Sequence, residues 1–279
     1  MERTGLVSDI FEKFSLKGRT AIVTGAAGLL GKEFCRTLAQ AGAMVVAADI
    51  NLPAAEIVEQ NLISNGYRVK AVQVDVTLPE SVSEMVNVAL RLTGKLDVLV
   101  NSAAMDPKFD PQNTGRHANT FEDYPVESWR QALDVNLTGM FLSCQAAARI
   151  MLAQNSGSII NICSTYGLVG PDQRIYLRPN QPPQYKPVYY SVTKAGVLGL
   201  TRYLATYFYG KNIRANSITP GGIYNQHDEV FTANYSARTV LGRMANRDEM
   251  NGALLFLASD ASSYMTGSNV VVDGGWTAW

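Results

Sequence analysis

The sequence is poor in the residues that build metal sites and disulfide frameworks. Its 279 residues include only 3 cysteines and 2 histidines. Cys35, Cys144 and Cys163 are scattered and show no metal-binding spacing, so neither a structural metal nor a disulfide scaffold is expected. An odd set of this kind predicts reduced thiols in a cytoplasmic protein.

An excess of charge of one sign and long apolar runs are also lacking. Lys and Arg number 24, and Asp and Glu also number 24. The chain therefore has no basic excess with which to bind nucleic acid phosphates. No apolar run reaches the roughly 18 residues of a membrane span, and residues 1–20 lack the apolar core of a signal peptide. Neither nucleic acid nor a membrane is expected as a partner.

Short β-branched runs alternate with helical patterns along most of the chain. Strands are predicted at 20–25, 43–49, 68–75, 95–101, 157–164, 213–218 and 269–275. Helices are predicted at 32–40, 53–64, 126–151, 188–209 and 247–259, and after a capping-box pattern of Thr77 and Glu80. Strands that alternate with helices need parallel crossover connections. We therefore predict an α/β fold in one domain, residues 1–279: a doubly wound (Rossmann) sheet of about seven parallel strands with helices on both faces.

A glycine-rich loop, "TGAAGLLG", follows the first predicted strand. Gly25, Gly28 and Gly31 would let the backbone approach a pyrophosphate that rests on the N-terminus of the next helix. Asp49 ends the second predicted strand, where a carboxylate accepts hydrogen bonds from an adenosine ribose and repels a 2′-phosphate. No Arg or Lys lies in the loop or just after Asp49. The pattern predicts NAD rather than NADP, although the glycines alone would also fit a simple tight turn.

Tyr190 and Lys194 lie four residues apart and would share one face of a helix. A free tyrosine titrates near pH ~10, and an adjacent ammonium would lower its pKa toward that of a useful general base. Tyr207 and Lys211 have the same spacing. Spacing alone therefore does not identify a catalytic pair.

Eight motifs, taken in order, resemble those of the short-chain dehydrogenase/reductase family over nearly the whole chain. They are "TGAAGLLG", Asp75 in "VDVT", "NSAA" at 101–104, Asn136 in "VNLTG", Ser164 in "INICS", "YSVTK" at 190–194, "PGGI" at 220–223 and "VVDGG" at 271–275. The likeness is to single-domain members. It is tightest to those that modify sugars and sugar acids, in surface-sugar biosynthesis or as gluconate 5-dehydrogenases.

The resemblance implies a catalytic set of four residues. Tyr190 would be the general acid/base, and Lys194 would activate it and hold the nicotinamide ribose. Ser164 would bind the substrate oxygen, and Asn136 would support a water that exchanges protons with Lys194. The reaction implied is hydride transfer between NAD and a secondary alcohol or ketone of a sugar, sugar acid or nucleotide sugar.

The resemblance also implies a cofactor groove, with Asp75 at the adenine and Ile223 at the carboxamide. Its expected residues are Gly25, Gly28, Leu29, Leu30, Gly31, Asp49, Ile50, Asp75, Val76, Asn101, Ser102, Ala103, Tyr190, Lys194, Pro220, Gly221 and Ile223. The glycine spacing itself resembles the sugar-nucleotide epimerases, but the large C-terminal substrate domain of those relatives is not found here.

Three segments are long enough to act as substrate loops: 104–124, 165–187 and 224–245. The second is an insertion that roughly doubles the family's usual interval between its serine and tyrosine, and it is rich in Pro, Tyr and Arg. The predicted substrate residues are Ser164, Tyr166, Arg174, Arg178 and Tyr190. A solvated or subunit-contacting loop is the alternative for this insertion.

Two other functions stay open at this point. One is a 3-oxoacyl-thioester reductase, which usually prefers NADP. The other is a catalytically silent NAD-binding sensor or scaffold, against which the intact set of four catalytic residues argues. By resemblance and from their broad apolar faces, helices 126–151 and 188–209 would pack against their copies to form a homotetramer or homodimer.

Overall fold

The computed structural model describes residues 9–106 and 119–279. Within them, one sheet holds seven strands: β1 (Thr20–Thr24), β2 (Met44–Asp49), β3 (Val69–Gln73), β4 (Val98–Asn101), β5 (Gly157–Ile162), β6 (Ile213–Pro220) and β7 (Asn269–Val272). All neighbours pair in parallel, in the order β3-β2-β1-β4-β5-β6-β7. The predicted doubly wound sheet is confirmed.

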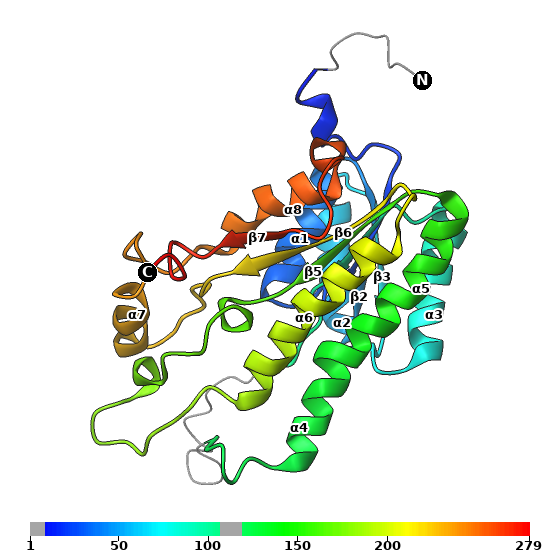
Figure 1. The fold of residues 1–279 in the computed structure, drawn as a ribbon. Helices are drawn as coiled ribbons and strands as arrows, with labels where there is room; N and C mark the ends of the chain where they lie inside the picture. The colour runs from blue at the N-terminus through cyan, green and yellow to red at the C-terminus, as the bar shows by residue number, and fades with distance from the viewer. Residues whose placement is uncertain (1–8, 107–118) are drawn as a thin grey trace.

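Helices cover both faces of this sheet. They are α1 (Leu29–Gln40), α2 (Leu52–Ile63), α3 (Pro79–Thr93), α4 (Val126–Leu133), α5 (Gly139–Gln154), α6 (Val188–Tyr207), α7 (Glu229–Ser236) and α8 (Asn251–Ala258). Figure 1 shows α1 and α8 on one side of the sheet and α5 and α6 on the other. No helix of residues 9–106 and 119–279 is both long and apolar enough to cross a membrane.

Alternation along the strands divides the core into two layers. Ile22 of β1 packs in the cluster built from α3, α5 and α6, together with Met85. Its neighbours Ala21 and Val23 pack in the opposite cluster, with Phe34 of α1 and with α2 and α8. Successive side chains of a strand point to opposite faces, so each buried strand needs apolar residues at almost every position. That requirement explains why continuous apolar runs marked the strands so well.

Three predicted details are wrong. The helix expected at 126–151 is divided, because a π-helical turn, Asp134–Thr138, separates α4 from α5. The segment 224–245, expected as a loop, contains α7, which Asp228 caps by accepting from the N–H of Phe231. The Thr77–Glu80 capping box does not form, because the Thr77 hydroxyl donates to Asp75 Oδ1 over 2.7 Å instead.

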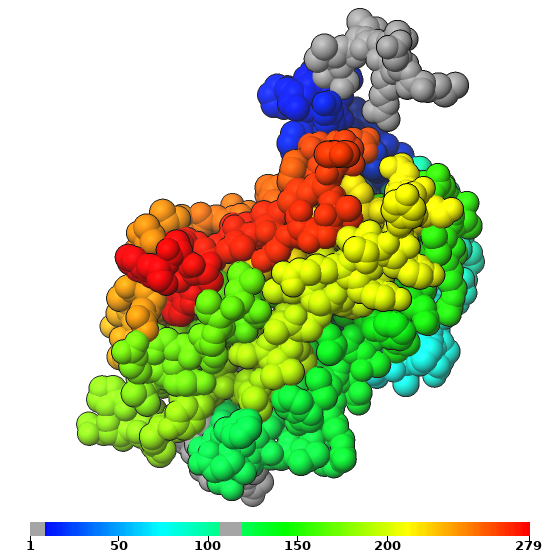
Figure 2. All heavy atoms as spheres, in the orientation of Figure 1, coloured from blue at the N-terminus to red at the C-terminus, as the bar shows by residue number. Residues whose placement is uncertain are grey.

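The carboxyl ends of the strands position the site. β1 and β4 are neighbours, so the chain order reverses between them, and open α/β sheets bind ligands outside that edge. The loops after β1, β4, β5 and β6 all leave from it. Residues 107–118 of the predicted loop 104–124 lie outside the described residues. Figure 2 shows the insertion 165–187 beside α7 at one end of the molecule.

Candidate active site

Ser164, Tyr190 and Lys194 meet where β5 ends against the start of α6. Ser164 follows β5 by two residues, and its hydroxyl accepts from the N–H of Tyr166 over 3.2 Å. Tyr190 lies in the first turn of α6, and Lys194 lies one turn further along. The buried Lys194 ammonium donates to the carbonyl of Ile162 over 2.9 Å. Helical spacing and strand end thus bring the three predicted catalytic side chains together.

The charge state of Tyr190 is governed by burial more than by Lys194. Burial raises the pKa of the phenol, the Asp106 carboxylate raises it further, and a hydrogen bond with Ser164 lowers it. Burial also lowers the pKa of Lys194, whose Nζ lies 5.8 Å from the centroid of the Tyr190 ring. Desolvation disfavours both charged forms and here outweighs the expected lowering of the tyrosine pKa by Lys194.

Asn136 lies in the π-helical turn, a distortion that is common at functional sites. Its side chain is buried and holds the backbone of Met105, accepting from its N–H over 2.6 Å and donating to its carbonyl over 3.1 Å. It also donates to Thr193 of α6 over 3.3 Å. Asn136 thus fixes the segment after β4 against the helix that carries Tyr190, a contact that no local sequence pattern indicates.

The glycine loop packs too closely for side chains at its turns. Gly25 has a φ of 67°, and a Cβ there would lie 2.8 Å from the Cα of Ala103. A Cβ on Gly31 would overlap the carbonyl oxygen of Gly25. The N-terminus of α1 has Gly28 as its cap, without a capping side chain, and has no acidic residue in its first turn. Its free N–H groups and positive dipole end fit a pyrophosphate.

Asp49 connects the glycine loop to the end of β2. One carboxylate oxygen accepts from the N–H of Ala27 over 2.9 Å, and the other accepts from the N–H of Asn51 over 3.0 Å. A carboxylate has about four acceptor positions, so capacity remains for the hydroxyls of a ribose. The exposed Ile50 beside it offers no positive charge. These residues fit an adenosine dinucleotide.

The other predicted groove residues lie in the segments that follow β1, β3 and β4. Asp75 lies just after β3 and accepts from the N–H and hydroxyl of Thr77. The amides of Ser102 and Ala103 both donate to the hydroxyl of Thr24 over 3.2 Å, which ties β4 to β1. Val76, Leu29 and Leu30 lie beside these segments at the same sheet edge.

The prediction that Asn101 lines the cofactor groove is corrected for its side chain, which lies in the core. It is buried and donates to Asn161 Oδ1 of β5 over 2.8 Å and to the thiol of Cys144 over 3.2 Å. The physical reason is strand alternation, which turns this side chain toward α5. Its place in the sequence motif did not reveal its direction.

The turn after β6 is shaped by close packing. Pro220 ends β6, and a Cβ on Gly221 would lie 2.8 Å from the Cα of Asp273. Ile223 forms an isolated parallel bridge with Ala245. Its backbone is thereby held at the predicted carboxamide side of the groove.

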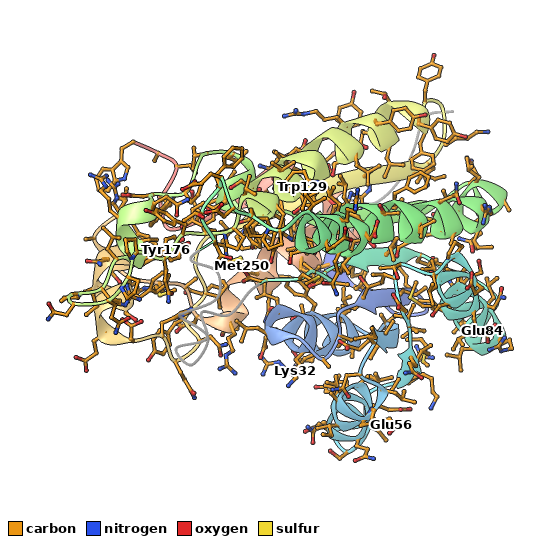
Figure 3. All side chains as sticks on the ribbon, turned by 90° about the horizontal axis from the view of Figure 1, so that it is seen from below. Lys32, Glu56, Glu84, Trp129, Tyr176 and Met250 are labelled. Carbon is orange, nitrogen blue, oxygen red and sulfur yellow. The ribbon has the colours of Figure 1, made fainter. Side chains whose placement is uncertain are left out.

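An aromatic cluster lines the inner side of the insertion. The Tyr176 hydroxyl donates to the Tyr166 hydroxyl over 3.0 Å, and both rings are buried. The ring of Tyr166 lies edge-on to Tyr190, with centroids 6.4 Å apart, and also edge-on to Trp276 near the C-terminus. Figure 3 shows Tyr176 at the end of the molecule opposite to Glu84 of α3. Tyr166 thus lies against Tyr190, and its role in substrate binding stays a prediction.

The two arginines of the insertion have acidic partners of their own. Arg174 makes two bonds to Asp172, at 2.8 and 2.9 Å. Arg178 binds Asp228 at 2.7 Å and two backbone carbonyls. These contacts argue against the predicted substrate role of both arginines, because each guanidinium is already paired within the surrounding loops.

Lys186 is a residue whose position the sequence did not reveal. Its Nζ lies 4.0 Å from the centroid of the Tyr190 ring, closer than that of Lys194. It forms an ion pair with Asp106 at 2.6 Å. Since Lys186 precedes α6, helical spacing carried no signal for this contact.

The Tyr207–Lys211 pair is not part of the site. Tyr207 is the last residue of α6, with 58% of its surface exposed, and its ring stacks on Tyr203. About five helical turns separate it from Tyr190. Tyr207 and Lys211 therefore have the same spacing as Tyr190 and Lys194 but no role in the site.

Comparison with known proteins finds relatives over nearly the whole chain. A family model described as enoyl-(acyl carrier protein) reductase matches residues 25–277. The chain is 36% identical to cis-4-hydroxycyclohexanecarboxylate dehydrogenase of Sinomonas cyclohexanicum, over 93% of this chain and 97% of the relative. It is 31% identical to NAD-dependent glycerol dehydrogenase of Listeria innocua, over 96% of this chain and 97% of the relative. Among solved structures, a gluconate 5-dehydrogenase from Burkholderia cenocepacia in complex with NADP and tartrate is similar with a TM-score of 0.84 at 29% identity, covering 97% of this chain and 100% of that one.

Proposed function

Because the chain belongs to the short-chain dehydrogenase/reductase family, we propose that it is an NAD-dependent oxidoreductase of secondary alcohols and ketones. Its preferred substrates are polar hydroxy compounds such as polyols, sugars, sugar acids or nucleotide sugars. The observation that supports this most is the meeting of Ser164, Tyr190 and Lys194 at the end of β5. Relatives that act on a cyclic hydroxy acid, on glycerol and on gluconate support the substrate class.

In alcohol oxidation the chain's own residues handle the proton and the oxygen. Tyr190 Oη takes the hydroxyl proton, while the Ser164 hydroxyl donates to the substrate oxygen and stabilises its developing charge. Tyr166 packs against the side of this site. Bound NAD supplies the hydride acceptor and, in its oxidised form, a positive charge. Lys194 would hold the nicotinamide ribose, and Asn136 would support a water for proton exchange.

The preference for NAD rests on Asp49. Its carboxylate is fixed by two backbone N–H groups at the predicted adenosine ribose site. A 2′-phosphate would meet this fixed negative charge without a basic residue at Ile50 or Asn51. Gly28, Leu29, Leu30 and Gly31 would supply the pyrophosphate site.

The direct test is a screen of polyols, sugar acids and hydroxycyclohexane derivatives for NADH formation. Tyr190→Phe and Lys194→Met should each lower kcat by about 10²-fold or more, the usual contribution of general acid–base catalysis. Tyr207→Phe and Lys211→Met are the matched controls and should keep kcat within about twofold. Equal losses from the two pairs would contradict the assignment, and absence of turnover in the wild type would favour a silent NAD-binding scaffold.

A second candidate function is supported by relatives named 3-oxoacyl-[acyl-carrier-protein] reductase, among them one of Synechocystis sp. at 33% identity over 94% of this chain and 98% of the relative. A 3-oxoacyl-thioester reductase would use the same tyrosine, lysine and serine. It would be revealed by faster NADPH-dependent reduction of acetoacetyl thioesters than NAD-dependent oxidation of any alcohol in the screen.

Self-association into a homotetramer or homodimer belongs to the same proposal. Figure 2 shows α5 and α6 side by side on the outer surface, and large apolar side chains such as Phe141 and Tyr203 are exposed along them. The three buried, unpaired thiols support a reducing compartment, the cytoplasm.

A further inference from the structure

Lys186 is a buried cation in direct contact with the catalytic tyrosine. Only 10% of its side chain is exposed, and its ammonium lies 4.0 Å from the centroid of the Tyr190 ring. A buried ammonium is costly unless an anion accompanies it. In the structure that anion is Asp106, at 2.6 Å. The Asp106 side chain is 60% exposed, so water can hydrate its carboxylate if it leaves the lysine.

Other cations near the site are already held. Lys194 donates to the Ile162 carbonyl, and its Nζ lies 5.8 Å from the centroid of the Tyr190 ring. Arg174 and Arg178 are paired with Asp172 and Asp228. Lys186 is therefore the cation, within the described part of the chain, that is best placed to meet an anionic group of a molecule bound at Tyr190.

Space for such a molecule adjoins the lysine. Lys186 helps to line a cavity of about 520 Å³ between residues 119–122, residues 171–173 and the start of α6. That size is typical of small-molecule sites. Ser191 lines the same cavity, and its buried hydroxyl has no hydrogen-bond partner among the described residues. Tyr190 itself does not line this cavity, so Lys186, which contacts both, is the residue that connects the tyrosine with it.

Resting on the proposed function, we propose that Lys186 binds the carboxylate of a hydroxy-acid substrate, and that Asp106 holds the same ammonium in the free enzyme. The exchange replaces one carboxylate by another, so the lysine keeps an anionic partner throughout. The backbone beside Asp106 need not move, because Asn136 holds Met105 by two hydrogen bonds. Only the exposed aspartate side chain must turn away.

Opposite effects of two substitutions distinguish this role from a structural ion pair. Lys186→Gln and Asp106→Asn both break the pair, so a purely structural pair predicts the same change from each. If Lys186 binds the substrate, Lys186→Gln removes the binding group, whereas Asp106→Asn removes its competitor. The first should raise KM for the hydroxy acid and the second should lower it.

The experiment measures kcat and KM for a hydroxy acid and for its uncharged primary amide, beginning with 4-hydroxycyclohexanecarboxylate and D-gluconate. Lys186→Gln should raise KM for the acid at least tenfold and leave KM for the amide within twofold. Lys186→Arg should recover most of the loss, and Asp106→Asn should lower KM for the acid. Arg174→Gln is the matched control and should change neither KM. Melting temperatures should fall by similar amounts in Lys186→Gln and Asp106→Asn.

The contrary outcomes separate this inference from the proposed function. If the wild type oxidises uncharged alcohols but none of the acids, or if both pair-breaking variants change KM alike for acid and amide, the role of Lys186 is wrong and the dehydrogenase stands. If the wild type oxidises neither class with NAD, the proposed function itself has failed.

Discussion

At the scale of single residues, the chemistry of the site depends on which charges reach Tyr190. The phenol is contacted by Lys186, while Asp106 pairs with that lysine and Lys194 stands further away. Charges from two long loops, Asp106 and Lys186, therefore act on the Tyr190 phenol, as does the lysine on its own helix. Each charge near it should be visible in the pH dependence of the reaction.

The first prediction concerns that pH dependence. Burial raises the pKa of Tyr190, and the charge of Asp106 raises it further. Oxidation needs the phenolate as proton acceptor, so kcat/KM for an uncharged alcohol should rise with pH until the phenol has ionised. Asp106→Asn removes a negative charge that disfavours the phenolate, so the rising limb should move to lower pH.

The measurement is kcat/KM for oxidation of an uncharged alcohol from about pH 6 to about pH 10. Glu127→Gln, which removes an exposed carboxylate on α4, is the control and should leave the limb in place. An unmoved limb in Asp106→Asn, or a shift to higher pH, would show that this carboxylate does not act on the tyrosine.

The second prediction concerns cofactor choice. Asp49→Ser combined with Ile50→Arg removes the carboxylate that repels a 2′-phosphate and adds a guanidinium at an exposed position beside it. The ratio of kcat/KM for NADP to that for NAD should rise at least tenfold. Asp49→Asn keeps an acceptor for the Ala27 amide and tests the charge alone. A wild type that already prefers NADP, the cofactor bound in the gluconate 5-dehydrogenase structure, would contradict our interpretation of β2.

At the scale of elements, the turn from β1 into α1 is the most tightly constrained part of the cofactor site. A Cβ on Gly31 would overlap the carbonyl oxygen of Gly25, and the loop cannot yield because Gly25 packs on Ala103. Gly31→Ala should therefore lower the melting temperature, with a cost of roughly 1–3 kcal/mol as in other overpacked sites, and should raise KM for NAD. Thermal unfolding and cofactor titration measure both effects.

Gly252 in α8 is the matched control for that substitution. A Cβ there would meet no atom within 4 Å. Because alanine favours a helix over glycine by up to about 1 kcal/mol, Gly252→Ala should leave the melting temperature unchanged or raise it. If the two variants behaved alike, the close approach at Gly31 would not be a constraint on the loop.

Elements also show what the sequence could and could not predict. The central strands β1, β4 and β5 were predictable because they are buried along almost their whole length, and β2 likewise carries the apolar run "MVVAA" before Asp49. The π-helical turn was not, since its residues Asp134–Thr138, "DVNLT", include no proline or glycine to indicate a break in the helix. α7 has only eight residues and lies in a segment that family likeness marks as a loop.

In the candidate site, residues placed by local sequence were likewise predictable, and contacts between distant segments were not. Tyr190, Lys194 and Ser164 were predicted from the family motifs, and helix spacing and a strand end explain how the local sequence brings them together. The pairing of Lys186 with Asp106 joins two loops separated by 80 residues, and no local pattern connects them. The pairing of Arg178 with Asp228 likewise joins residues that are distant in sequence, whereas Arg174 pairs with Asp172, two residues away.

At the scale of the whole molecule, function is assembled at one edge of a sheet by segments from the entire chain. The glycine loop follows β1, Asp49 ends β2, Ser164 follows β5 and the turn at Ile223 follows β6. The opposite, outward faces of α5 and α6 take no part in this edge. Their exposed apolar side chains indicate that they serve as a contact surface.

The last prediction is that these faces join copies of the chain. Phe141 of α5 is 46% exposed and Tyr203 of the neighbouring α6 is 63% exposed, and burying such side chains favours association. Light scattering at micromolar concentration should find a multiple of the 30.3 kDa chain mass, two or four. Phe141→Lys would place an ammonium in the apolar contact and should shift the species toward the single chain. Leu92→Lys on α3 changes a side chain of nearly equal exposure, 43%, away from α6 and should leave the assembly intact. A wild type of 30.3 kDa, or equal effects of the two lysines, would mean that the α5–α6 face is not the interface.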